Sequence, residues 1–596
     1  MKRKVLILIY ASIIALAAVS FLVILEAKDV PLPLELSVIS SEGTERLSCW
    51  KGEDGYYVFL PSYASMDRVL IGKTSNTKVR FRGTALENTM EVGNIRMNEP
   101  YPVEYWAFGI RYESTVTFVQ SENIPTLFLD TKSGNMDLIH GSKNNEESGA
   151  VRIYTRDGQM DFSGTVKSLK GRGNTSWTLN EKKPYTLTLE EPHNLLGLGS
   201  GSKWILLANA ADYSNVRNKL VFDYAKAIGM PYVPDSAWVN VYLNGEYAGL
   251  YLLCEKIEVN PDRVDISVEG SFLVSMEAET RLLSSGDPYF ATDNGQVLRL
   301  RYAADEEFAA QIMQAVEDAV MSGSSEEILK QIDLDSWVKK YLVDELFGNL
   351  DACYLSQYFY YDASDPNGKV FAGPVWDYDL SMGKLWQMRD PRVFYGNRSL
   401  VKAGIYAPWF CELYKNKVFY EHMVRTFETV CLPAMEELLE NKLPEYAELV
   451  ASSAETDRIR WGISMVETET DLGAYLSEHV DFLKDVWIRE EPYYIVQSDS
   501  GTGVNYIYHA VKPGQTLAEL PIHVESEYSA FQGWCYAESG KPIDPDKPID
   551  GDLEIYAKWK VDRRMQYLDD ILPIGLFAVA FLGLLISMLH RMRKGG

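Results

Sequence analysis

Three aspartates stand near the open end of a predicted β-hairpin, where they could share one cation. Asp351 precedes the hairpin, and Asp377 and Asp379 follow it. Hard divalent cations such as Mg²⁺ bind oxygen ligands and often hold substrate phosphates as well. Three converging carboxylates would therefore suit a metal and phosphate site. The residues alone leave two alternatives open, namely ordinary solvated acids and a calcium site that stabilises the fold.

The hairpin itself is predicted from strand and turn signals. Tyr354–Asp362 and Lys369–Trp376 are strand-prone, and the residues DPNG between them form a strong turn signal. Folding about the centre of that turn places Asp377 opposite roughly Ser356. The same folding places Asp379 opposite roughly Tyr354. The acids should therefore converge although they are far apart in sequence.

Apolar runs near both ends of the chain predict two membrane spans. Val5–Leu25 carries no charge and follows three basic residues, and Ile571–Leu589 precedes three more. Runs of this length can cross a bilayer, and basic flanks favour cytoplasmic tips. We therefore expect an extracytoplasmic main body. The expected segments are an uncleaved anchor or, alternatively, a cleaved signal peptide at 1–29, a transmembrane helix at 569–590 and a basic cytoplasmic tail at 591–596.

The composition argues against several function classes. The formal net charge of -26 disfavours nucleic acid as a partner, because a polyanion needs a basic binding face. The six cysteines include no CxxC pair, so neither a zinc site nor a disulfide framework is indicated. The seven histidines lack metal-binding spacing. The fold must therefore depend on hydrophobic cores.

The chain has 596 residues, which is enough for three or four domains. The turn Asn244-Gly245 predicts a hairpin over Val239–Leu253. Helical periodicity predicts helices over 212–228, 308–347 and 404–490. The expected domains are a small β module at 30–118, a main domain at 119–490 and a compact β module at 491–562.

Six motifs in order resemble the CotH kinase family, the spore-coat-protein-H type of atypical secreted protein kinase. The resemblance covers roughly residues 120–490. A shorter resemblance, over 495–560, is to a single Listeria-Bacteroides surface repeat of β-grasp-like form. The six motifs are GRGNTSW (171–177), KKPYTLTL (182–189), DYSNVRNKL (212–220), NVYLNGEYAGLYLLCEKIEV (240–259), NLDACYLSQYFYY (349–361) and GPVWDYDLSMG (373–383).

The resemblance implies a fold and an activity. The implied fold class is α+β, a divergent protein-kinase-like core flanked by small β modules, with N- and C-terminal transmembrane helices. The implied activity is transfer of phosphate from ATP, with Mg²⁺ or Mn²⁺, to protein side chains at the cell envelope. A pseudokinase, or a structural or adhesive cell-surface protein, is the alternative.

Phosphoryl transfer depends mainly on positioning and on charge neutralisation. By resemblance, Asp351 would orient or deprotonate the acceptor hydroxyl, while Asp377 and Asp379 would hold the metal. Protein kinases carry a metal-binding asparagine five residues after the catalytic aspartate. Here Ser356 takes that position and Gln357 follows it, so the second metal site departs from the pattern.

Four further residues are candidates for nucleotide binding. Lys183 opens a predicted strand and would contact a phosphate, although a solvated lysine explains it equally well. Arg172, between two glycines, would bind phosphate unless the glycines only form a tight turn. Arg217 and Glu255 would position Lys183 or touch a phosphate.

Overall fold

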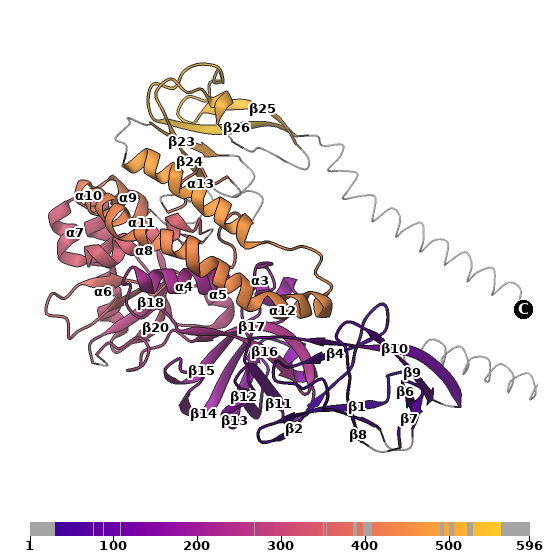
Figure 1. The fold of residues 1–596 in the computed structure, drawn as a ribbon. Helices are drawn as coiled ribbons and strands as arrows, with labels where there is room; N and C mark the ends of the chain where they lie inside the picture. The colour runs from indigo at the N-terminus through magenta and orange to yellow at the C-terminus, as the bar shows by residue number, and fades with distance from the viewer. Residues whose placement is uncertain are drawn as a thin grey trace, which may run out of the picture. The chain divides into compact units, whose positions relative to one another are not determined.

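The computed structural model describes residues 30–561 except 75–76, 88, 108, 268, 350, 353, 385–389, 397–407, 489–493, 500–505, 521 and 523–528. The chain divides into two compact units (Figure 1). The first unit comprises Met1–Ala210, Ala237–Leu253 and Leu449–Ser464. The second unit comprises Ala211–Ser236, Cys254–Glu448 and Met465–Gly596.

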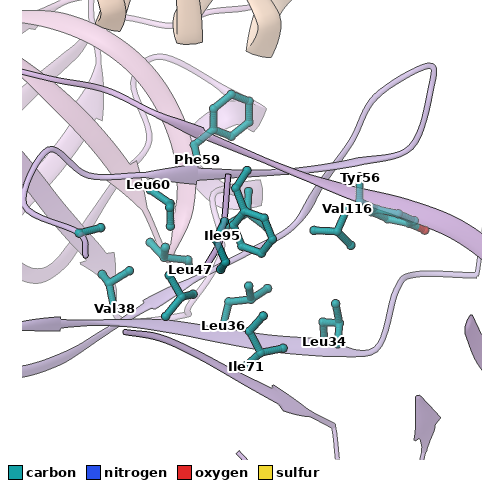
Figure 2. Packing of buried hydrophobic residues seen from close by; sticks show 14 of the residues in the cluster. Leu34, Leu36, Val38, Leu47, Tyr56, Phe59, Leu60, Ile71, Ile95 and Val116 are labelled. Atoms are coloured by element: carbon teal, nitrogen blue, oxygen red, sulfur yellow. The ribbon is translucent and has the colours of Figure 1, made fainter. Parts of the chain in front are cut away.

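The first unit begins with two β-sheets that share one hydrophobic core. The four-stranded sheet has the order β2-β1-β5-β8, and the six-stranded sheet has the order β3-β4-β10-β9-β6-β7. Figure 2 shows Leu36 and Ile71 of the first sheet packed with Leu60 and Val116 of the second. Alternate residues of β1, β6 and β9 face this core, as the two-residue period of a strand requires. The strands are β1 (Leu34–Ser40), β2 (Gly43–Leu47), β3 (Trp50–Lys51), β4 (Tyr56–Leu60), β5 (Val69–Lys73), β6 (Lys78–Phe81), β7 (Thr84–Ala85), β8 (Met90–Val92), β9 (Pro100–Ala107) and β10 (Ile110–Gln120).

Seven strands that follow close into a barrel in the order β11-β12-β13-β14-β15-β17-β16. β11 and β16 pair in parallel, and this pairing closes the barrel. The predicted hairpin at Asn244-Gly245 is confirmed, because both residues have positive φ (52° and 84°) and join β16 to β17. The elements are β11 (Thr126–Thr131), α2 (Asp137–Gly141), β12 (Glu146–Tyr154), β13 (Met160–Gly171), α3 (Thr175–Leu179), β14 (Tyr185–Asn194), β15 (Ser200–Leu207), β16 (Ser236–Leu243) and β17 (Glu246–Glu255).

The barrel shows that the predicted fold class was wrong. A protein-kinase-like core was expected, but the structure consists of mixed sheets and a closed seven-stranded barrel. Strand periodicity does not reveal closure, because β11 and β16 pair across more than a hundred residues of sequence. The terminal transmembrane helices of that prediction are not supported either. No helix within the described residues is long and apolar enough to cross a membrane, and both predicted spans lie outside those residues.

The second unit contains a five-stranded sheet in the order β19-β20-β18-β21-β22. The predicted helix over 212–228 exists but begins later, as α4 (Arg217–Ala227), and it stops at Gly229, whose φ is 76°. The sheet strands and the short helix among them are β18 (Phe272–Met276), α5 (Glu279–Ser285), β19 (Tyr289–Ala291), β20 (Val297–Ala303), β21 (Tyr358–Tyr361) and β22 (Val370–Ala372).

The predicted helical stretch over 308–347 forms three helices, each with its own N-cap. The side chains of Asp305, Ser324 and Asp333 accept hydrogen bonds from backbone N–H groups of the first turns. Gly323, with φ 68°, ends the first of these helices. The helices are α6 (Glu306–Ser322), α7 (Ser325–Gln331) and α8 (Leu334–Leu346).

The region 404–490 is mainly helical where it is described, as predicted, with a non-helical connection at 462–468, and it is followed by a small sheet. That sheet has the order β24-β23-β26-β25 and its own core around Trp534 and Ile555. The helical segments are α9 (Trp409–Lys415), α10 (Lys417–Thr426), η3 (Phe427–Cys431), α11 (Leu432–Glu437), η4 (Leu438–Lys442), α12 (Leu443–Trp461) and α13 (Glu469–Trp487). The final elements are β23 (Tyr494–Asp499), β24 (Tyr506–Val511), η5 (Leu517–Glu519), β25 (Ser529–Tyr536) and β26 (Leu553–Val561).

The predicted acidic hairpin is confirmed as β21 and β22, with shorter strands than expected. Phe359 pairs with Ala372, two residues earlier than the sequence arithmetic placed its partner. A shift of two residues keeps every side chain on its predicted face. On its other side, β21 pairs with β18, so the hairpin lies inside a larger sheet.

Candidate functional site

The open end of the hairpin brings two predicted site residues into contact. The hydroxyl of Ser356 donates a hydrogen bond to Asp377 Oδ2 at 3.0 Å. Both residues have positive φ, 54° for Ser356 and 73° for Asp377, which L-residues adopt rarely. Such backbone conformations persist where the surroundings enforce them and are frequent at functional sites.

Three aspartates act electrostatically on a fourth, Asp379. Burial and, after it, the charges of Asp377, Asp351 and Asp212 together raise the pKa of Asp379 to about 8. We call Asp212, Asp351, Asp377 and Asp379 the acid cluster. Asp212 was not predicted as a site residue. The only signal for it was its place at the start of the motif DYSNVRNKL.

The donor chemistry of the acid cluster fits a hard divalent cation. Carboxylates held together at the cost of a raised pKa are typical of a site where a cation supplies the missing positive charge. The Oε1 atom of Gln357 is buried and has no hydrogen-bond partner among the described residues. Its Nε2 donates to Asp351 O at 3.3 Å. As they stand, no three Asp, Glu, His or Cys side chains of the described part are arranged to hold one metal ion.

The start of α4 holds the segment that carries two of these acids. Asn218 Oδ1 accepts a hydrogen bond from the backbone N–H of Tyr378, which lies between Asp377 and Asp379, at 2.8 Å. Arg217 Nε donates to Ser381 O at 3.0 Å. The motifs DYSNVRNKL and GPVWDYDLSMG therefore contact each other through side chain to backbone bonds.

Arg217 is surrounded by protein groups. Its side chain is 1% exposed and its NH1 donates to Asp212 Oδ1 at 2.6 Å. Glu467 accepts two parallel bonds from the guanidinium, at 2.9 and 3.1 Å. Lys384 Nζ donates to the same carboxylate at 2.9 Å and lies 3.4 Å from the ring centre of Tyr213. Sequence reasoning missed Glu467 and Lys384, because no motif links them to α4.

Glu255 lies in the second unit and is tied to its own neighbourhood. Its Oε2 accepts a hydrogen bond from Asp235 N at 2.7 Å, and its Oε1 is 3.6 Å from Arg263 Nε. Burial raises the pKa of Glu255 to about 7. These contacts join Glu255 to Asp235 and Arg263 and not to a residue of the acid cluster.

Lys183 and Arg172 belong to the first unit, whereas the acid cluster belongs to the second. Lys183 Nζ donates to Trp177 O at 2.6 Å, and Arg172 N donates to Pro184 O at 3.2 Å. A Cβ at Gly171 would lie 2.3 Å from the Trp177 ring, so glycine is required there. The motifs GRGNTSW and KKPYTLTL therefore pack against each other.

The neighbouring Lys182 is the more buried of the two lysines. It is 3% exposed, and its Nζ donates to Asp457 at 2.9 Å and to Leu250 O at 2.6 Å. Gly249, with φ 116°, has Asp457 Oδ1 2.1 Å from the place where a Cβ would be. The buried ion pair accounts for Lys182 in the motif KKPYTLTL, and the close approach of Asp457 accounts for Gly249 in the motif NVYLNGEYAGLYLLCEKIEV. Both contacts lie within the first unit.

One comparison with known proteins found a match. The family model described as CotH kinase protein matches residues 169–494, more than half of the chain. This range contains all six motifs and every residue of the acid cluster. No curated protein matches the chain. The resemblance of residues 495–560 to a surface repeat stays a prediction.

Proposed function

Because the chain belongs to the CotH kinase family, we propose that it transfers a phosphate group from ATP to a protein side chain with the help of Mg²⁺ or Mn²⁺. Family membership indicates a kinase-like enzyme. The observation that carries the metal-dependent part is the open end of the hairpin, where Ser356 contacts Asp377 and where Asp379 interacts electrostatically with Asp377, Asp351 and Asp212. Clustered carboxylates are costly unless a cation neutralises them, and nucleotide phosphates are handled together with such a cation.

Asp377 and Asp379 are the proposed metal ligands. Ser356, which is hydrogen-bonded to Asp377, and the neighbouring Gln357 are proposed as further oxygen donors. A divalent cation bound there would neutralise negative charge on the phosphates. Asp351 is the proposed base, which orients the acceptor hydroxyl and accepts its proton. The backbone carbonyl of Asp351 accepts a hydrogen bond from Gln357 Nε2 at 3.3 Å.

Arg217 is proposed to act on the site by holding Asp212 and the backbone of Ser381. Lys183 and Arg172 remain proposed phosphate contacts, and each lies in a motif that the family model covers. Glu255 is proposed to position nucleotide-binding groups through Arg263.

The proposed acceptor is a protein of the cell envelope, reached on the extracytoplasmic side of the cell membrane. The support is the likeness to secreted kinases and the likeness of residues 495–560 to a surface repeat. The net charge of -26 supports a partner other than nucleic acid.

The test is phosphate transfer by the purified protein. Incubation with labelled ATP and Mn²⁺ should yield phosphorylated protein, with the modified residues found by mass spectrometry. Asp377→Asn should lower the rate by at least about a hundredfold, as expected when charge stabilisation at the transition state is lost. The matched control Asp365→Asn changes an acid at the turn end of the same hairpin and should keep the wild-type rate.

Three other results would lead to different conclusions. Absence of both metal and nucleotide binding by the wild-type protein would exclude the proposal. Nucleotide binding without transfer would indicate a pseudokinase. Stabilisation by Ca²⁺ alone, lost in Asp377→Asn, would indicate a structural calcium site.

A further inference from the structure

A buried carboxylate on α8 contacts the loop that carries Asp351 and the segment that carries Asp377 and Asp379. Asp344 Oδ1 accepts a hydrogen bond from the hydroxyl of Tyr378 at 2.7 Å and another from Asn349 Nδ2 at 2.9 Å. Asp344 O also accepts from Asn349 N at 3.0 Å. One side chain therefore joins the loop before β21 to the segment after β22.

Lys340 neutralises this carboxylate from one helical turn earlier. The two side chains form an ion pair and are 1% and 2% exposed. Lys340 Nζ also lies 3.4 Å from the hydroxyl of Tyr378. A buried charge that is both paired and hydrogen-bonded is held in one position, because any movement would leave it without compensation.

The first arm of this network ends at a member of the acid cluster, and the second ends at the residue between two members. Through the first arm, Asn349 Oδ1 accepts a hydrogen bond from the backbone N–H of Asp351 at 3.0 Å. Through the second arm, Tyr378 is held at its hydroxyl by Asp344 and at its backbone by Asn218. Tyr378 stands between Asp377 and Asp379 in the chain, so both acids depend on its placement.

We propose that Asp344 is a positioning residue that holds Asp351 at a fixed separation from Asp377 and Asp379. The inference rests on the proposed function, since it assumes that these acids serve one metal and phosphate site. Asp344 does not itself act on the substrate. Its role is to hold the loop before β21 and the segment after β22 together, in addition to the hydrogen bond between Ser356 and Asp377.

Tyr378→Phe tests this inference, because it removes one arm and leaves the Asp344–Lys340 pair intact. Mn²⁺ affinity, measured by electron paramagnetic resonance without nucleotide, should weaken about 3- to 10-fold, the equivalent of one lost hydrogen bond. The matched control is Tyr224→Phe. Tyr224 is also buried in the second unit, and its hydroxyl donates to Cys431 O at 3.0 Å. The control should lose similar thermal stability and keep wild-type Mn²⁺ affinity.

Asn349→Ala tests the other arm and keeps the inference falsifiable if Tyr378→Phe does not fold. It should also weaken Mn²⁺ binding, and the double variant should lose less affinity than the two single effects combined, because both arms act through Asp344. Wild-type Mn²⁺ affinity in folded Tyr378→Phe or Asn349→Ala would overturn the positioning role alone. Absence of Mn²⁺ binding by the wild-type protein would instead overturn the proposed function, and this inference with it.

Discussion

Ser356 and Asp377 are hydrogen-bonded across the open end of the hairpin while both have left-handed backbones, with φ of 54° and 73°. Each such conformation costs on the order of 1 kcal/mol or more for a residue with a side chain. Two residues with such backbones are in contact here, and one of them, Asp377, belongs to the acid cluster. We infer that the surrounding sheet and α4 enforce this local geometry.

At position 356, glycine should destabilise the protein less than a β-branched residue does. Ser356→Val should be less stable than Ser356→Gly by about 1–3 kcal/mol, because valine is strained at positive φ and glycine is not. Chemical denaturation of the two variants measures this difference. Both lose the hydroxyl that contacts Asp377, so metal affinity should fall alike in both. Equal stability would contradict the backbone argument.

Arg217 should be needed for stability. Arg217→Met leaves Asp212 buried without its guanidinium partner, and breaking such a pair costs about 3–5 kcal/mol. The control is Lys219→Met on the same helix, which removes a more exposed pair with Asp223 and should cost at most about 1 kcal/mol. If Arg217→Met melted like the wild-type protein and lost only ATP affinity, Arg217 would be a phosphate ligand instead.

Lys182 and Lys183, which lie just before β14, should differ in how much each contributes to stability and to ATP binding. Lys182→Met breaks a buried ion pair with Asp457 and should cost about 3–5 kcal/mol of unfolding free energy. Lys183→Met should cost about 1 kcal/mol or less, since it removes one hydrogen bond to Trp177 O. In the phosphate-transfer assay, Lys183→Met should raise KM for ATP about tenfold, the equivalent of one lost charged hydrogen bond. An unchanged KM would exclude the phosphate role of Lys183.

Glu255 should make stability fall as pH rises from about 4.5 to about 7. In this window the folded protein keeps the Glu255 proton that the unfolded chain has released, because burial raises the pKa of Glu255 from 4.5 to about 7. Folding then takes up a proton, so the free energy of unfolding decreases with pH, by at most roughly 3 kcal/mol in total.

Glu255→Gln should flatten this part of the pH profile, measured by denaturation at pH 4.5, 6 and 7.5. The surface variant Glu412→Gln, which removes the partner of Lys415, should keep the wild-type slope. A wild-type slope in Glu255→Gln would show that another group is responsible.

The local parts of the site were predictable from sequence. The DPNG turn, the aromatic strand before it and the acids at the open ends predicted the hairpin, with Asp377 roughly opposite Ser356. The register was wrong by two residues, because β21 also pairs with β18, and the residue that faces a strand depends on the whole sheet. That pairing joins residues about ninety positions apart, which turn signals do not reveal.

The partners of these acids were not predictable in the same way. Glu467 reaches Arg217 from the turn before α13, and Asp344 reaches Tyr378 from α8. Their sequence context is that of ordinary acids near or within helices. Burial distinguishes them, and burial is a property of the packed chain. The assignment of Arg217 as a phosphate contact was made without knowledge of these neighbours.

The amino-acid sequence by itself determined the family, the short-range turns and caps, and the carboxylates around which a cation site can form, because each depends on residues close together in the chain. The tertiary structure decided the closed barrel, the addition of Asp212 to the acid cluster and the ion pairs behind it. Those features require groups separated by tens to hundreds of residues to meet away from water, and only there do their charges and hydrogen bonds interact strongly enough to matter.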